Sequence, residues 1–76
     1  MVMFMKLKNA LEGKGYIIKS IDTNDSELDA FLFSLGCYPG EEIIVVSQLK
    51  GGCIVYIKDG RYSIDNQLAE AIKVAE

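Results

Sequence analysis

Two cysteines carry the most reactive side chains of this sequence, which contains no histidine. Cys37 stands in the stretch SLGCYPGEEIIVV, directly after an expected helix end, and Cys53 follows a pair of glycines. A reactive thiol needs a nearby cation, a helix N-terminus or a base to favour the thiolate. The negative end of a helix opposes it instead. We therefore expect both cysteines to be reduced and to pack as small apolar side chains.

A metal site is not expected either. The two cysteines lie far apart in sequence and have no histidine to join them, whereas structural zinc sites consist of Cys and His ligands. The acidic run DTNDSELD, residues 22–29, superficially suggests a calcium loop, but the central glycine and the terminal bidentate glutamate are missing. Helix capping explains its residues more simply. The sequence thus predicts no metal ligand and no cofactor.

The composition also argues against several function classes. Eight basic and eleven acidic residues give a net charge of −3, and the basic residues do not cluster as nucleic-acid binding requires. No apolar run approaches the length of about 20 residues that spans a bilayer. The pair Gly51-Gly52 is too short for a phosphate loop, and nothing marks a catalytic cleft. Binding is therefore a better class than catalysis, and we expect no enzyme activity.

A strand and a helix are expected in the first half of the chain. The lead-in closes at Gly13 and Gly15, and residues 15–22, GYIIKSID, have the β-branched character of a strand. Apolar residues recur with the spacing of one helix face at Leu28, Phe31, Leu32 and Leu35. This spacing predicts a helix of about ten residues. Ser26 with Asp29 resembles a weak capping pair. Gly36 suits a left-handed C-cap.

Turn residues divide the second half into short strands. Pro39 and Gly40 fit the two central positions of a type II turn. The run of four β-branched residues at 43–46 predicts a strand with both faces partly covered. Gly51 and Gly52 turn the chain, and Asp59-Gly60 predicts a two-residue type I′ hairpin. Asn66 is a candidate cap for a helical turn, and a last strand is expected at 72–74.

This order of elements predicts a mainly β fold, a small SH3-like barrel of about five to six strands. One α-helix is inserted and a short helical turn lies near the C-terminus. Closure of the barrel would hide the strand edges that so small a sheet cannot otherwise cover. At 76 residues the chain makes a single domain.

Aromatic residues offer two possible binding surfaces. Four tyrosines could line a groove for proline-rich peptides; they are Tyr16, Tyr38, Tyr56 and Tyr62. Phe33 lies off the apolar face of the expected helix, and with Tyr38 it could form part of a contact patch.

The ordered motifs resemble the family of ferrous iron transport protein A, the FeoA-type domain. The matching pieces are a helix ending in Leu-x-x-Leu-Gly at 32–36, Pro39-Gly40, strands at 43–46 and 54–57 around Gly51-Gly52, and an Ala-x-x-Ile-x-Val ending at 69–74. The resemblance covers nearly the whole chain. Departures are Ala30-Phe31 and Ile64-Asp65, where family members often carry arginine, and Cys53, where proline is common.

The resemblance implies an SH3-like accessory protein of the bacterial cytoplasm. Binding of nucleic acid and insertion into the membrane are not expected, on the grounds of composition given above. Its partner would be the membrane-embedded ferrous iron transporter that carries a GTPase domain. The expected contact residues are Phe33, Tyr38, Pro39, Lys50 and Arg61. Three alternatives stay open: a self-associating or peptide-binding barrel, a barrel related to those of metal-dependent repressors, and direct sensing or carriage of iron.

Overall fold

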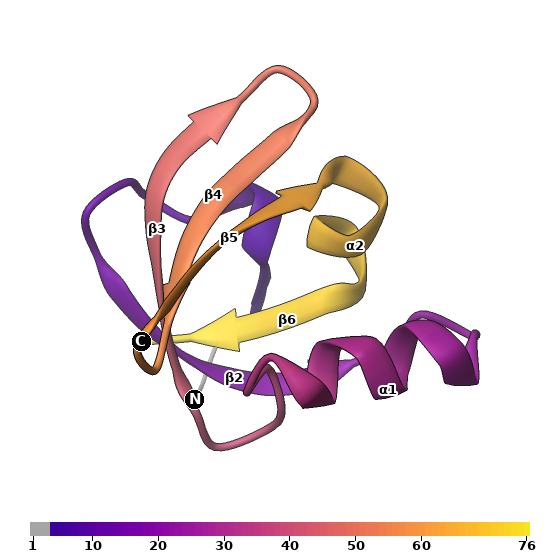
Figure 1. The fold of residues 1–76 in the computed structure, drawn as a ribbon. Helices are drawn as coiled ribbons and strands as arrows, with labels where there is room; N and C mark the ends of the chain where they lie inside the picture. Colours follow the sequence, from indigo (N-terminus) through magenta and orange to yellow (C-terminus); the bar gives the residue numbers. More distant parts are fainter. Residues whose placement is uncertain (1–3) are drawn as a thin grey trace.

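The computed structural model describes residues 4–76 and contains six strands, two α-helices and one 3₁₀ turn (Figure 1). The elements are β1 (Met5–Lys6), η1 (Leu7–Asn9), β2 (Gly15–Ile21), α1 (Ser26–Ser34), β3 (Glu42–Leu49), β4 (Gly52–Ile57), β5 (Gly60–Asp65), α2 (Asn66–Ala71) and β6 (Ile72–Ala75). None of the described helices is long and apolar enough to cross a membrane.

All six strands form one antiparallel sheet in the order β1-β6-β2-β3-β4-β5. The last strand lies between two of the earliest, since Val74 pairs with Met5 on one side and with Ile18 on the other. The sheet curls around a single core, and helix α1 lies outside it (Figure 1). The predicted mainly β, SH3-like architecture is confirmed.

Closure of the barrel differs from the expectation in one respect. β1 and β5 stand at the two ends of the described sheet and do not pair with each other. Helix α2 lies at this opening and packs against η1, β1 and β5. The barrel is therefore completed by side chains of α2 and not by a backbone ladder, so the free edge of β5 remains.

The N-terminal lead-in is more structured than the sequence suggests. Residues 5–9 form β1 and η1 where only a turn was expected, and Leu7 is fully buried. The side chain of Gln48 on β3 donates to the carbonyl oxygens of Leu7 (3.3 Å) and Ala10 (2.8 Å). This segment lacks a periodic pattern because a distant side chain, not local propensity, holds it. Residues 1–3, the start of the predicted lead-in, lie outside the described residues.

The core follows the alternation of the strands. The fully buried large side chains come from seven elements and one connection; they are Leu7, Tyr16, Ile18, Leu32, Cys37, Ile43, Val45, Val55, Ile57, Ile64, Ile72 and Val74. On β3, Ile43 and Val45 are buried but Val46 is 37% exposed. The expectation that both faces of this strand are partly covered is thus confirmed only at its start, since Ile44 on the outer face is half-buried while Val46 is exposed.

Helix α1 begins and ends through local hydrogen bonds. Asp25, not the expected Ser26, is the N-cap: its carboxylate accepts from the backbone N–H groups of Glu27 and Leu28. Gly36 ends the helix with φ +94°, as predicted. Only Leu32 of the helix is fully buried, and Phe31 is 53% exposed although it belongs to the predicted apolar face. The helix contacts the barrel along a narrow stripe. The apolar face predicted from the sequence is therefore wider than the face that the structure buries.

Turns in the second half are partly as predicted. Gly40 has φ +97°, and the N–H of Glu41 donates to the carbonyl of Tyr38, as in the expected turn. The β4–β5 hairpin is different, because its two loop residues are Lys58 and Asp59, and Lys58 has φ +53°. Gly60 is already in the strand, paired with Ile57. The ring of Tyr62 occupies the space that a side chain at Gly60 would need.

The cap of α2 is also one residue earlier than expected. Asp65 accepts from the N–H of Leu68 at 2.9 Å. Asn66 instead ties down the β3–β4 turn, since its backbone N–H donates to Gly51 and its side chain donates to the carbonyl of Lys50. Gly52 takes φ +156° against the backbone of β5, which explains why this turn carries glycine.

Candidate functional site

An exposed aromatic pair forms where α1 ends and β3 begins. The ring centroids of Phe33 and Tyr38 lie 4.9 Å apart with a 33° angle between the planes. Phe33 is 64% exposed, and Tyr38 is half-buried. Gly36 makes this pairing possible, because its left-handed turn brings the chain back past the last helical turn. The pair therefore presents an exposed aromatic surface at this corner of the molecule.

The β4–β5 hairpin supplies a cation to the same corner. The aliphatic stem of Lys58 lies against Gly36, where a Cβ atom would be 3.0 Å from its Cδ. Its Nζ lies 5.4 Å from the Tyr38 ring centroid and 3.0 Å from Oε1 of Glu41. We call Phe33, Tyr38, Pro39, Glu41 and Lys58 the corner patch.

Charge in the corner patch is locally balanced. The hydrogen bond from Lys58 lowers the pKa of Glu41, and the same bond raises the pKa of Lys58. Both groups are therefore charged at neutral pH. Exposed ion pairs contribute little to stability. The pair instead orients Lys58 over the ring of Tyr38, leaving an aromatic surface with one cation and one anion at its rim.

The residues expected to contact a partner are divided between two ends of the sheet. Phe33, Tyr38 and Pro39 lie together in the corner patch. Arg61 lies on the outer face of β5 opposite Tyr56, one step from the hairpin that carries Lys58. Lys50 lies in the β3–β4 turn at the other end of β4. Sequence reasoning missed Glu41 and Lys58, whose only signal is that Glu41 follows the turn glycine Gly40 and Lys58 stands two residues before Gly60.

The four tyrosines do not share one surface. Tyr16 is 1% exposed, and its hydroxyl accepts from the N–H of Leu11 in the interior. Tyr56 is 45% exposed on the outer face of β4. Because inward and outward residues alternate along a strand, these two rings lie on opposite faces of the sheet.

Both cysteines are buried and free, as the sequence predicts. Burial raises the pKa of the Cys37 thiol to about 11 and also raises that of Cys53. Both thiols are therefore protonated at neutral pH and are poor nucleophiles. Within residues 4–76, no group of three or more His, Cys, Asp or Glu side chains is arranged to hold a metal ion. In the acidic run, Asp25 caps α1 and Thr23 Oγ1 donates to Asp29.

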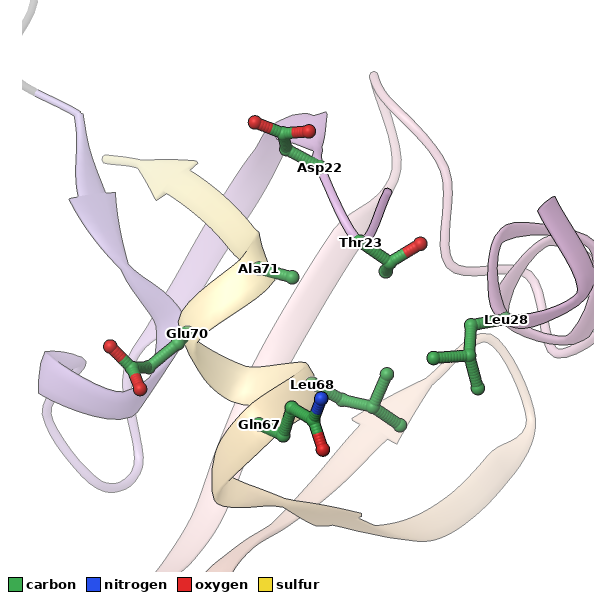
Figure 2. Close-up of a pocket in the computed structure, with 7 residues that line it drawn as sticks. All are labelled: Asp22, Thr23, Leu28, Gln67, Leu68, Glu70 and Ala71. Atoms are coloured by element: carbon green, nitrogen blue, oxygen red, sulfur yellow. The ribbon is translucent and has the colours of Figure 1, made fainter. Parts of the chain in front are cut away.

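A pocket with a volume of about 260 Å³ lies between the two helices, apart from the corner patch. It is lined by Asp22, Thr23, Leu28, Gln67, Leu68, Glu70 and Ala71. Leu28 of α1 and Leu68 of α2 extend into it from opposite sides, with carboxylates at the rim (Figure 2). Coulombic attraction from Lys8 lowers the pKa of Glu70. The sequence gives no sign of this pocket, because its walls come from distant segments.

Comparison with known proteins identifies the family of this chain. A family model described as the FeoA domain matches residues 5–76. An iron uptake regulatory protein (FeoA) of known crystal structure is 26% identical, with a TM-score of 0.86 over 96% of this chain and 97% of that chain. The solution structure of iron(II) transport protein A from Clostridium thermocellum is 27% identical, with a TM-score of 0.84 over 93% of this chain and 44% of that one.

A manganese-dependent transcriptional repressor is similar in fold. It is 18% identical, with a TM-score of 0.89, and the match covers 99% of this chain but only 42% of the repressor. No curated protein matches the chain.

Proposed function

Because this chain belongs to the FeoA domain family, we propose that it acts in ferrous iron transport by binding the cytosolic part of a membrane-embedded GTPase-type ferrous iron transporter. Family membership supports the role in ferrous iron transport, and this family is an accessory one with no known enzyme activity. The transporter as partner, and the cytoplasm as the place of action, are our proposals.

The observation that carries the proposal is the exposed Phe33–Tyr38 pair. Aromatic side chains dominate the binding energy of many protein interfaces when a partner covers them. Phe33 has most of its surface free to be covered, and its ring is already packed on Tyr38, so little side-chain entropy is lost on binding. A rigid aromatic surface with Pro39 beside it and charges at its rim has the composition of an interface centre.

The remaining expected contacts extend from this centre. Arg61 lies near enough to the β4–β5 turn to act at the rim of the corner patch. Lys50 becomes a contact only for a partner that covers the whole length of β4. A net charge of −3 favours a basic partner surface, for which association is faster at low salt.

The proposed mechanism is a shift of populations and needs no catalytic group. A transporter with a nucleotide-binding domain has several conformational states, and an accessory domain that binds one state more tightly favours that state. The shift is limited by the difference in affinity between the states. The corner patch suits this role because its geometry is fixed by Gly36, Gly40 and the Lys58 stem before any partner binds.

Capture of the transporter from detergent-solubilised membranes by immobilised protein tests the proposal. Phe33→Ala and Tyr38→Ala should each reduce capture at least tenfold, about 1.4 kcal/mol, as expected for central interface residues. Phe31→Ala is the matched control, since it removes a phenylalanine of similar exposure, 53% against 64%, from the other flank of the same helix. Equal capture by all variants, each shown by circular dichroism to be folded, would exclude the corner patch. No capture by wild-type protein would exclude the partner.

A further inference from the structure

Strand β5 leaves one side of its backbone without a partner. In the described chain it pairs only with β4. The two-residue hairpin closes on the pair Ile57–Gly60, which must be a hydrogen-bonded pair. The alternation along an antiparallel ladder then turns the N–H and C=O groups of Arg61 and Ser63, and the N–H of Asp65, away from β4. No backbone hydrogen bond to these groups is present from any other described element.

This edge has few of the features that usually prevent edge-to-edge pairing. Proteins protect edges with very short strands, bulges, proline, charged side chains (lysine above all) or a covering helix or loop. β5 has six residues, its register with β4 is regular, and its sequence GRYSID contains neither proline nor lysine. The opposite edge, β1, has only two residues. Arg61 and Ser63 are both exposed, so an incoming strand can reach the edge.

The outward side chains of β5 are self-complementary. Arg61, Ser63 and Asp65 point to the same face of the strand, with a cation at one end, a hydroxyl at the centre and an anion at the other end. An antiparallel copy centred on Ser63 places each arginine opposite an aspartate. Asp65 uses Oδ1 to cap α2, and this leaves its second carboxylate oxygen available.

We propose that a second copy of this chain pairs with β5, antiparallel and with the two Ser63 residues opposite each other, to form a twofold-symmetric dimer. In this register the dimer contains two symmetric pairs, each between Arg61 of one subunit and Asp65 of the partner subunit. The backbone N–H and C=O groups of β5 that point away from β4 also gain hydrogen-bond partners. Registers shifted by two residues also provide hydrogen bonds for the backbone groups, but they place Arg61 or Asp65 opposite Ser63 and so leave a charged side chain without a partner of opposite charge. An isologous interface of this kind closes on itself and does not propagate into filaments.

The dimer is weak, because two edge strands bury less surface than a stable interface requires, and because each chain carries a net charge of −3. The dimer does not rest on the proposed transporter contact, since self-association needs no transporter. Its test therefore uses purified protein alone.

Sedimentation velocity over a range of concentrations, together with amide hydrogen exchange, tests the dimer. Wild-type protein should show reversible dimerisation, with the amides of Arg61 and Ser63 becoming slower to exchange as concentration rises. Ser63→Pro should abolish both effects without unfolding the protein, because the lost N–H faces away from β4. Arg61→Glu replaces two attractive pairs with two repulsive ones and should weaken dimerisation about tenfold or more.

A charge exchange makes the test specific for the register. Asp65→Lys should also be monomeric alone, but an equimolar mixture with Arg61→Glu should form a heterodimer, because both cross-strand pairs then become attractive. Lys19→Glu, which changes the net charge as much as Arg61→Glu but lies on β2, should dimerise almost as wild type does. A wild-type protein that remains monomeric at about millimolar concentration, or dimers that survive Ser63→Pro, would overturn the proposal. So would a mixture that fails to associate while both variants keep their α2 helix.

Discussion

Two neighbouring residues of α1 should differ sharply in their contribution to stability. Leu32 is 0% exposed and is the only fully buried side chain of the helix, whereas Phe31 is 53% exposed. Replacing a fully buried leucine by alanine costs about 2–5 kcal/mol, from lost transfer energy and the remaining cavity. Replacing a half-exposed phenylalanine removes about half of a burial energy of roughly 1.5–3 kcal/mol, and alanine recovers several tenths through its higher helix propensity.

The expected losses are thus about 3 kcal/mol for Leu32→Ala and below about 1 kcal/mol for Phe31→Ala. Domains of this size have total stabilities of roughly 4–11 kcal/mol, so the first variant loses a large fraction. With a urea slope of about 1 kcal/mol/M for a small domain, its unfolding midpoint should fall by about 3 M. Urea unfolding followed by circular dichroism measures both.

The comparison refutes the reasoning if the two midpoints fall equally or if Phe31→Ala falls further. Either result would mean that α1 packs with the wide apolar face indicated by its sequence periodicity, and not with the narrow stripe of the structure. A change in the urea slope of Leu32→Ala would indicate instead that the helix detaches before the barrel unfolds.

Three further predictions concern a turn, a thiol and an ion pair. Gly52→Ala should cost at least about 2 kcal/mol in urea unfolding, because a Cβ there overlaps the β5 backbone, while Gly51→Ala, in open space, should cost less than about 1 kcal/mol. Cys37, with its pKa raised from 9.0 to about 11, should resist iodoacetamide at pH 8 until urea unfolds the chain. The preference of the folded state for the protonated thiol stabilises the protein fully below pH 9, and this stabilisation is lost as pH rises to about 11. Between these pH values the free energy of unfolding of the wild type should therefore fall more than that of Cys37→Ala. Lys58→Met should return the pKa of Glu41 toward its ordinary range in an NMR titration, with little loss of stability.

The sequence predicts the fold well because local signals and the core pattern agree. Strands β2, β3 and β4 follow β-branched runs bounded by turn residues, and the burial of Cys53, Val55 and Ile57 follows the alternation of a strand. The errors in the element ends are small. The caps at Asp25 and Asp65 and the loop at Lys58 are each shifted by one residue from the expected positions. For the loop, the pairing of Ile57 with Gly60 in the sheet, not turn propensity, decides where β5 begins.

The candidate site is less predictable, since its contacts join residues far apart in the chain. Phe33 and Tyr38 were identifiable, because an aromatic residue off the apolar face of a helix needs another explanation. Lys58 and Glu41 were not, because the first reaches the corner only through the fold of a hairpin that lies beyond β3. The open edge of β5 was hidden for a related reason, since strand order is not encoded in the strands themselves.

The two proposed contacts adjoin each other at Arg61, so the dimer should affect binding of the transporter. A dimer places the partner subunit's β5 beside Arg61, three residues from Lys58 of the corner patch, so dimerisation should hinder a large partner from covering that patch. Ser63→Pro, which remains monomeric, should then capture the transporter at least as well as wild type when the protein is concentrated, and equally well when it is dilute. Arg61→Glu should weaken both contacts. If capture by wild type and by Ser63→Pro is the same at every concentration, the dimer and the transporter contact use separate surfaces.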